Sequence, residues 1–392
     1  MKTLLCLLGL SLPAAAQPIP RKPPVCHTLD GRILRRPAID QLVRQLMDSA
    51  KVAGLAVALL EDNRVRYLHT YGYRNVEAKA PLEPNTAMYA ASFSKAVFAY
   101  LVMQLVQEKL VDLDRPLYQY LPKPIPDYDP YRDLAGDERW KLLTARMALT
   151  HTTGLPNWRW IEDDKKLRFK FEPGARYGYS GEGLQLLQLA VETITQKGLV
   201  QLSEERVFRP LAMSQTSYVW QPAFDQNFAM GYDEQGQSLG VRKRSKAQAA
   251  GSMETTPADY AAFMAAVMQG QGLSEATKAE MIRPQVRIPF QAQFGPLATV
   301  AAPDSNRTIQ LSYGLGWGTF RSPYGRAYFK EGHDDGWENH SVIFGDRKKG
   351  LLLMSNSSNG DKIFKALLQR LLGDTATPWQ WENYVPYQMA EK

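Results

Sequence analysis

The sequence predicts an α+β protein in which one antiparallel sheet is flanked by N- and C-terminal helices and joined to an all-helical second lobe. Two observations lead to this prediction. Runs of β-forming residues occur near both ends of the chain, and residues 144–270 between them are mostly helical and loop-like in pattern. Because a sheet face must be covered by another layer, we expect the two end segments to share one sheet under helices from both termini.

The predicted elements follow in chain order. Residues 38–52 carry apolar residues at helical spacing, and the next stretch has two β-type runs around Asp62-Asn63, which predicts a hairpin. Residues 92–110 form a strong helical pattern with an apolar face, whereas residues 112–142 are rich in Pro, Tyr and Asp and are expected to be loops with short turns.

The second half supplies the remaining elements. Thr256-Pro257 is typical of a capped helix start, so we expect a helix through Val267. After residue 310, four strands are expected in LSYGLGWGTF, GRAYFKEG, HSVIFGD and GLLLMSNSS, and a closing helix in DKIFKALLQRLLG. We therefore place a domain at 38–373, with an α/β part at about 38–135 and 300–373, a helical lobe at about 136–299, and a C-terminal tail at 374–392.

The N-terminus has the pattern of a secretory signal. One lysine precedes the apolar run from Leu4 to Leu12, and Ala14 to Ala16 provide a cleavage site. We expect a signal peptide over 1–16 cleaved near Ala16, an extended leader over 17–37, and an exported protein, periplasmic or secreted. A buried N-terminal element is the alternative. No later stretch is apolar enough for stable membrane insertion.

Composition narrows the function classes. The 392 residues are 44% hydrophobic and 22% charged, which fits a globular protein and excludes collagen-like and disordered classes. The net charge is +7, but Lys and Arg are scattered and the densest run, 242–246, is typical of a solvated loop. We therefore expect no nucleic-acid partner. Cys26 is the one cysteine after the signal, so an intramolecular disulfide is not possible.

The first candidate site lies at the start of the 92–110 helix. Ser92 falls near the helix N-cap, and Lys95 is three residues further on, so both side chains share one helix face. A lysine whose pKa is lowered by burial can remove the proton of a serine hydroxyl and make it a nucleophile. The alternative is a capping serine beside a surface lysine; the apolar stretch after Lys95 favours the catalytic interpretation.

The second candidate is Tyr179 in PGARYGYSGEGLQLL, a glycine-rich loop that opens a helix. A tyrosine hydroxyl near a lysine can relay a proton, although an ordinary core tyrosine is the alternative. The same stretch narrowly misses a G-x-S-x-G nucleophile motif, because Glu182 replaces the final glycine and no strand pattern precedes it.

The third candidate is His333 in EGHDDGWENHSVIF, at the end of a predicted strand, where an imidazole could contact substrate. A metal site made of His333, Asp334, Asp335 and His340 is the alternative, although its spacing fits no standard signature and CxxC and HExxH motifs are absent. We expect no metal and no organic cofactor.

Taken in this order, these pieces resemble the serine β-lactamase and penicillin-binding protein superfamily, especially the class C β-lactamase-related esterases and D-peptidases. Residues 38–373 carry the resemblance, including LVDLDRPLYQYLP, LTARMALTHTTGLP and AGSMETTPADYAAFM. It implies a sheet plus a helical lobe with the site between them, Ser92 as the acylated nucleophile, Lys95 as base, Tyr179 as proton relay, and His333 opening the strand motif. It also implies an oxyanion hole from the N–H groups of Ser92 and Gly336.

Two positions depart from the resembled pattern. Gly181 stands where the Y-x-N triplet has asparagine, and Asp335 stands where the strand motif has glycine. Both are expected to line the substrate path, where Asp335 could favour a substrate with a positive charge. Trp158 and Trp160, in the 155–172 loop, are candidate walls of the pocket, with exposed-loop packing as the alternative.

The resulting hypothesis is an exported serine hydrolase that acts on an ester, amide or β-lactam carried by a small molecule or peptide. The alternative from a different class is a catalytically silent protein that binds peptide or cell-wall fragments in the same cleft. The sequence leaves the acyl substrate and the oligomeric state open.

Overall fold

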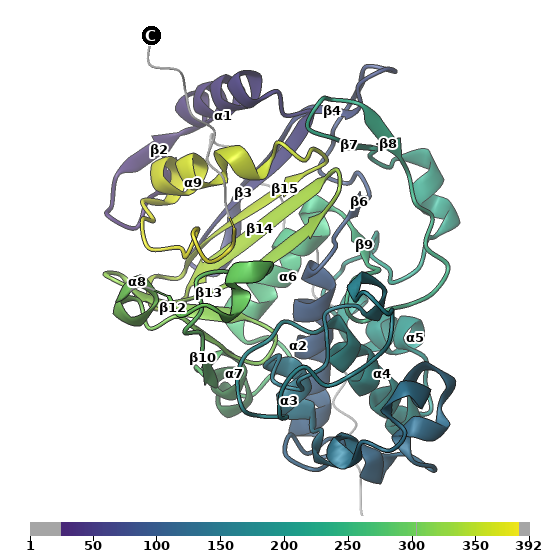
Figure 1. The fold of residues 1–392 in the computed structure, drawn as a ribbon. Coiled ribbons are helices and arrows are strands. Elements are labelled where there is room, and N and C mark those ends of the chain that lie inside the picture. The colour runs from purple at the N-terminus through teal and green to yellow at the C-terminus, as the bar shows by residue number, and fades with distance from the viewer. Residues whose placement is uncertain (1–24, 303, 384–392) are drawn as a thin grey trace, which may run out of the picture.

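A nine-stranded antiparallel sheet forms the centre of the α+β fold (Figure 1). The computed structural model describes residues 25–302 and 304–383. The predicted signal peptide and residues 17–24 of the predicted leader lie outside the described residues. The strands are ordered β10 (Val286–Arg287), β11 (Ser312–Tyr313), β12 (Gly318–Ser322), β13 (Gly325–Asp334), β14 (Trp337–Phe344), β15 (Lys349–Ser355), β3 (Gly54–Glu61), β4 (Arg64–Asn75) and β5 (Ala80–Pro81).

The two ends of the chain meet in the middle of this sheet, as the sequence predicts. Strand β15 pairs with β3, so that Leu353 lies opposite Val57 although almost 300 residues separate them in sequence. The β3–β4 hairpin turns at Asp62-Asn63, where both residues have positive φ as a tight hairpin requires.

The two faces of the sheet are buried under different layers. Along β3, Leu55, Val57 and Leu59 join one apolar core and the alternate residues join another, as the two-residue period of a strand requires. The first core contains α1 (Arg36–Ala50) and the C-terminal helical segment, α9 (Phe364–Leu367) with the π-helical turn Leu368–Leu372. The second contains α2 (Phe93–Gln107) and α6 (Pro257–Gln269) (Figure 1).

Helix α2 is more deeply buried than its sequence predicts. An apolar face was expected, but nearly every residue from Phe93 to Met103 is inaccessible to solvent. The helix runs between the sheet and the helical part of the molecule, so it has no side that faces water. A lysine in its first turn is therefore inside the protein.

The helical part of the fold carries α3 (Ala145–Leu149), α4 (Gly181–Thr195) and α5 (Leu199–Ser203), and the chain also forms α7 (Glu275–Ile282) and α8 (Asp304–Thr308), the latter beside β12 (Figure 1). Two short strand pairs lie outside the main sheet: β6 (Met88–Tyr89) pairs with β9 (Glu254–Thr255), and β7 (Gly231–Tyr232) pairs with β8 (Ser238–Gly240). Helix α6 begins as predicted, with the Thr256 hydroxyl accepting a hydrogen bond from the N–H of Asp259 at 3.1 Å.

Both predicted terminal extensions are partly folded where the structure describes them. Residues 25–35 form a hairpin of β1 (Val25–His27) and β2 (Ile33–Arg35) rather than an extended leader, because the buried Cys26 side chain joins the sheet core. In the predicted tail, Trp381 is 1% exposed and its ring packs against Phe329 and Tyr177. Within the described ranges, the helices are all too short or too polar to cross a membrane.

Candidate active site

Ser92 lies at the N-terminus of α2, at the capping position that the sequence predicts. Its side chain makes no capping hydrogen bond among the described residues; instead its Oγ lies 2.9 Å from Lys95 Nζ. The preceding residue, Ala91, has a left-handed backbone with φ of 46°, which a side chain rarely adopts. This sharp turn presents the hydroxyl at the end of the helix, and such strained residues concentrate at functional sites.

Lys95 is 1% exposed, as the burial of α2 requires. Its Nζ also donates a hydrogen bond to the main-chain oxygen of Ala250 and lies 4.8 Å from the centre of the Tyr179 ring. Burial holds the pKa of the Lys95 amine well below its usual range, and the nearby charge of Lys330 lowers it further. An amine with a lowered pKa is thus placed beside the Ser92 hydroxyl.

Tyr179 joins this pair from the loop that precedes α4. Its side chain is 7% exposed, and burial together with the charge of Glu331 raises the pKa of its hydroxyl well above the usual range. Tyr179 therefore remains a neutral phenol when Lys95 is a neutral amine. The structure brings together Ser92, Lys95 and Tyr179, the three residues that the sequence singles out first.

The ring of His151 packs against the ring of Tyr179, and this residue was not identified from the sequence. Its ring centre lies 4.2 Å from that of Tyr179, and its Nδ1 accepts a hydrogen bond from the N–H of Ser180 at 3.1 Å. The imidazole is 1% exposed, and burial lowers its pKa well below the usual range, so it is neutral. It fixes the position of the Tyr179 ring without adding charge.

Lys330, on β13, is the fourth polar side chain of the site, and the sequence analysis missed it. Its Nζ lies 3.3 Å from the Tyr179 hydroxyl and 2.7 Å from Glu331 Oε1. This corrects the assignment of the strand motif to His333: the structure places Lys330, three residues earlier, at Tyr179. The signal was present, because Lys330-Glu331-Gly332 has the lysine and glycine of the K-T-G pattern with glutamate between them.

Gly332 allows β13 to lie directly on the N-terminus of α2. A Cβ at this position would be 3.3 Å from the main-chain nitrogen of Ser92 and 2.6 Å from the oxygen of Ala90. A contact of 2.6 Å is closer than carbon and oxygen atoms approach, so only glycine fits. The strand and the nucleophile are therefore in van der Waals contact through their main chains.

The end of β13 has one open edge next to Ser92. Strand β12 pairs with β13 only as far as Phe329, so residues 330–334 are paired with β14 alone. The β13–β14 hairpin closes with Asp334 opposite Trp337, and the closing pair of a two-residue hairpin is hydrogen-bonded. Because hydrogen-bonded and non-hydrogen-bonded pairs alternate, the N–H of His333 points away from β14 toward the open edge.

The His333 side chain lies apart from the Ser92 group. The imidazole Nδ1 is 2.6 Å from Glu338 Oε1 and the side chain is 66% exposed. The Glu338 carboxylate raises the pKa of His333 to about 9, so the ring is a cation at neutral pH. The imidazole, which was expected to contact substrate, is thus paired with Glu338, and the His333 main chain is what borders the Ser92 group.

The predicted roles of Gly336 and Asp335 also need correction. The N–H of Gly336 already donates to Ser358 Oγ at 2.8 Å, so it is not available to an oxyanion. Both residues form the tight turn between β13 and β14, where Gly336 has a φ of 81° and Asp335 is exposed. Asp335 therefore does not stand at the glycine of the strand motif, since Gly332 holds that place.

The alternative metal site does not assemble. His333 faces Glu338, whereas His340, on the same face of the β13–β14 pair, has its Nε2 3.2 Å from Glu382 Oε2. No group of three or more possible metal ligands gathers within residues 25–302 and 304–383. The two histidines of the predicted ligand set thus have different carboxylate partners, whereas Asp334 lies near Arg244 and Asp335 is exposed.

Gly181, the other departure from the resembled pattern, is explained by Trp158. A Cβ at Gly181 would lie 2.7 Å from the main-chain oxygen of Asn157 and 2.8 Å from the Trp158 ring, so the asparagine of a Y-x-N triplet has no room here. The Trp158 ring centre is 5.7 Å from Lys95 Nζ and stacks on Trp160 at 4.5 Å. An aromatic wall thus replaces a side-chain amide, and Trp158 lines the site as expected.

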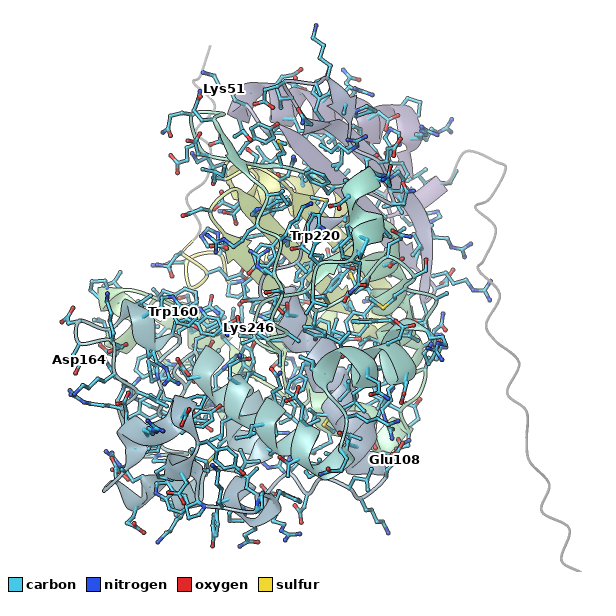
Figure 2. All side chains as sticks on the ribbon, turned by 90° about the vertical axis from the view of Figure 1, so that its right-hand side faces the viewer. Lys51, Glu108, Trp160, Asp164, Trp220 and Lys246 are labelled. Atoms are coloured by element: carbon cyan, nitrogen blue, oxygen red, sulfur yellow. The ribbon has the colours of Figure 1, made fainter. Side chains whose placement is uncertain are left out.

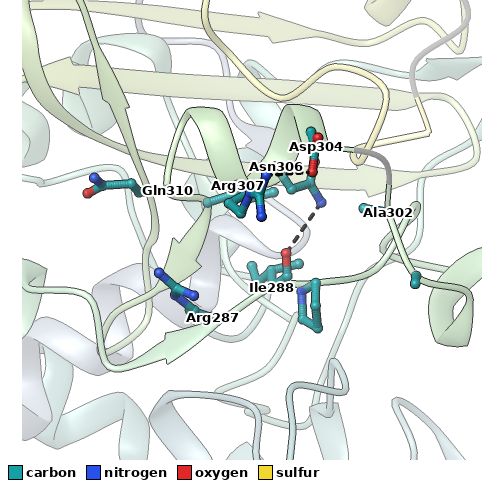
Figure 3. A pocket seen from close by; sticks show the side chains of 10 residues that line it. Arg287, Ile288, Ala302, Asp304, Asn306, Arg307 and Gln310 are labelled. Atoms are coloured by element: carbon teal, nitrogen blue, oxygen red, sulfur yellow. Dashed lines mark hydrogen bonds and ion pairs between the residues drawn. The ribbon is translucent and has the colours of Figure 1, made fainter.

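A cavity of about 320 Å³ extends from this wall, between Trp158, Trp160, Arg159 and α4 residues such as Gln185. Trp160 is 54% exposed and is labelled in Figure 2 at the upper edge of the helical part. A different cavity, of about 240 Å³, lies near β10 (Figure 3). There Asn306 donates a hydrogen bond to the Ile288 oxygen, and none of the lining residues belongs to the Ser92 group.

The fold and this site define a class of protein. A serine beside a buried lysine and tyrosine, between an antiparallel sheet and a helical part, is the arrangement of the β-lactamase and penicillin-binding protein type of serine hydrolase fold. Residues 39–374 match the model of the Beta-lactamase family, and the chain belongs to that family.

Known relatives are distant in sequence. Penicillin-binding protein 4* of Bacillus subtilis (strain 168) is 23% identical over 373 residues, covering 86% of this chain and 75% of that protein. Protein flp of Staphylococcus aureus (strain MW2) is also 23% identical, but the match covers 52% of this chain and 43% of flp.

Two solved structures share the fold. The octameric penicillin-binding protein homologue from Pyrococcus abyssi matches with a TM-score of 0.69 and 20% identity, covering 86% of this chain and 77% of that one. The D-alanine carboxypeptidase AmpC from Burkholderia cenocepacia matches with a TM-score of 0.65 and 19% identity, covering 82% of this chain and 94% of that one. At these identities the likeness establishes the fold.

Proposed function

We propose that this chain is a serine hydrolase that forms an acyl-enzyme on Ser92, with an ester, amide or β-lactam as substrate. The observation that carries the proposal is the 2.9 Å separation between Ser92 Oγ and the Nζ of a fully buried lysine. An amine whose pKa is lowered can be a neutral base near neutral pH. It can then remove the proton of a hydroxyl that lies at hydrogen-bond distance.

The chemical steps follow from the positions of the side chains. Lys95 Nζ takes the proton from Ser92 Oγ as the Oγ–carbonyl carbon bond forms. The bond to the leaving group then breaks, and the leaving group receives the proton through Tyr179, whose hydroxyl is held by Lys330. A water molecule then attacks the acyl carbon; Lys95 and Tyr179 take a proton from this water and deliver it to Ser92 Oγ as the Oγ–acyl carbon bond breaks and the acid product leaves. The reaction as written needs no metal or organic cofactor.

The developing oxyanion requires two main-chain donors. We assign these to the N–H groups of Ser92 and His333: the first belongs to the first turn of α2, and the second points to the open edge of β13. The contact of Gly332 with Ser92 brings the two donors close together. Loss of one such donor typically costs about 3–4 kcal/mol of transition-state stabilisation.

The test is covalent labelling followed by a kinetic control. A fluorescent phosphonate should label Ser92, as located by mass spectrometry, and hydrolysis of p-nitrophenyl acetate should fall by about a thousandfold or more in Ser92→Ala. Ser49→Ala, which removes a hydroxyl on α1 that bonds only to the Gln45 oxygen, should leave the rate unchanged. A label on another residue would refute the assignment, and a wild-type protein with no label and no turnover would support the silent binding protein.

A further inference from the structure

A separate acidic cavity borders the candidate active site. It has a volume of about 340 Å³ and lies between β13, β14, the start of the C-terminal helical segment and residues 379–383. Its lining includes Phe294, whose ring packs edge-to-face on Tyr179 at 5.2 Å, and Glu331, which binds Lys330. The cavity is therefore one side chain away from the proton relay at Ser92.

Four carboxyl groups line this cavity: Glu331, Glu338, Asp361 and Glu382. Two of them have a cationic partner, because Glu331 binds Lys330 and Glu338 binds His333. No lysine or arginine is among the described residues that line the cavity. Glu382 lies 3.2 Å from the His340 ring, and the charge of Lys330 also acts on it. The lining is thus richer in acid than in base.

Two carboxylate oxygens in the lining lack a hydrogen-bond donor. The Glu382 side chain is 7% exposed, and its Oε1 has no partner among the described residues; Oε2 of Glu331 is in the same position. A buried polar atom without a partner costs about 1–3 kcal/mol, so native structures rarely leave one without a ligand or water to bind it. Both of these oxygens are acceptors and would pair with a ligand that carries donors; the ring nitrogens of His340 in the same lining also make no hydrogen bond among the described residues.

The aromatic part of the lining suits the same kind of ligand. Phe294, Phe364 and Trp379 supply ring faces and edges around the carboxylates. A cation near aromatic rings is stabilised by their negative faces, and an ammonium group carries three N–H donors for carboxylate oxygens. A metal ion fits less well, because the described part of the chain holds no group of three or more side chains placed to coordinate one.

We propose that this cavity binds an ammonium group of the substrate, and that the enzyme prefers esters or amides with a positively charged substituent over their neutral and anionic counterparts. The inference rests on the proposed function for its kinetic part. On this proposal, the carboxyl groups that select a positively charged substrate are those that line this cavity, and not the side chain of Asp335.

The kinetic test compares three acetate esters of equal chain length: an ω-aminoalkyl ester, the uncharged alkyl ester and the ω-carboxyalkyl ester. Wild-type kcat/KM should be about tenfold higher for the amino ester than for the uncharged one, and lowest for the carboxy ester. Glu382→Gln should reduce the amino-ester preference about threefold or more with little change on the uncharged ester. Glu275→Gln, at an exposed site on α7, should preserve the preference.

A binding test separates this inference from the proposed function. Binding of n-butylammonium, butanol and butyrate to the catalytically inactive Ser92→Ala protein is measured by ligand-observed NMR, with Glu382→Gln in the same background. Selective binding of n-butylammonium that Glu382→Gln weakens supports the cavity assignment even if no ester is hydrolysed. Equal binding of the three probes, or turnover of all three esters at the same rate, would overturn it.

Discussion

The Nζ of Lys330 lies 3.3 Å from the hydroxyl of Tyr179, although 151 residues separate them in the chain. This contact links the sheet to the helical part of the molecule beside Ser92 and Lys95. It also places a second buried lysine close enough to Lys95 to lower the pKa of the latter. Lys330 is thus an electrostatic neighbour of the proposed base as well as a partner of the proposed relay.

The pH dependence of hydrolysis should reveal the effect of Lys330 on the pKa of Lys95. Lys95 acts as a base only when neutral, so kcat/KM should rise with pH through the pKa of Lys95, well below the 10.5 of an ordinary lysine. In Lys330→Met the repelling charge is gone, the pKa of Lys95 rises, and the rising limb should move to higher pH. The profile of hydrolysis of a p-nitrophenyl ester measures this.

Lys123→Met is the matched control, since this lysine is exposed and remote in the structure. Its pH profile should coincide with that of the wild type. If Lys330→Met stays active and the rising limb of its pH profile does not move, the electrostatic role of Lys330 is contradicted.

Substitution of Gly332 should separate β13 from the nucleophile. The Cβ of Gly332→Ala would lie 2.6 Å from the Ala90 oxygen, so strand and helix must move apart and the proposed oxyanion donors with them. We expect kcat to fall by about a hundredfold or more, as for loss of an oxyanion-hole donor. Gly198→Ala, where a Cβ meets nothing within 4 Å, should retain the wild-type rate. Similar rates for the two variants would be incompatible with the close contact.

The pairing of Gly181 with Trp158 can be tested by exchange. Gly181→Asn should lower both activity and thermal stability, because its Cβ would be 2.8 Å from the Trp158 ring. Adding Trp158→Ala removes the ring contact but leaves the contact with the Asn157 main-chain oxygen at 2.7 Å, so the double variant should regain only part of the stability lost in Gly181→Asn. Melting temperatures of the three variants measure the coupling. Additive effects would show that the two positions do not compete for space.

His333 should titrate as an ion-paired histidine. Glu338 raises its pKa from 6.5 to about 9, so the pair stabilises the folded protein fully below pH 6.5, and this stabilisation is lost as the pH rises through about 9. NMR titration of the imidazole should give this raised pKa in the wild type and a pKa displaced toward 6.5 in Glu338→Gln. An unchanged pKa in the variant would show that another group is responsible.

The C-terminal segment should contribute to stability. The Trp381 side chain is 1% exposed and packs against Phe329 and Tyr177, so Trp381→Ala should cost about 3–5 kcal/mol of unfolding free energy. Urea denaturation measures the loss. Trp160→Ala, at a 54% exposed position, should cost much less. Equal losses in both variants would contradict the packing of this segment.

Sequence patterns predicted the sheet, its flanking helices and the Ser92–Lys95 pair because each depends on local spacing, whereas Tyr179 was placed with that pair by the resemblance to a known family. The β-type run in residues 54–61 and the i, i+3 relation of Ser92 and Lys95 are visible without coordinates. Lys330 was missed because its role depends on its distance to Tyr179. That distance is set by the packing of segments far apart in the chain, which the residue spacing within β13 does not reveal.

The errors at the chain ends have a related cause. Residues 25–35 and 374–383 lack a periodic pattern, and their order comes from long-range packing of a few side chains such as Cys26 and Trp381. The assignment of an oxyanion donor to Gly336 failed because its N–H is bound by Ser358, a contact with another loop. Local patterns carry no information about such partners.

The pairing of β3 with β15 sets the order in which this protein can mature. Ser92 is made early and Lys330 late, and the sheet that aligns them is closed only when residues 349–355 reach β3. Until then the nascent chain holds a nucleophile without its electrostatic surroundings, and contacts of such long sequence separation form slowly. Catalytic competence is therefore the last property that the growing polypeptide acquires, and a prematurely terminated product would be inert rather than partly active.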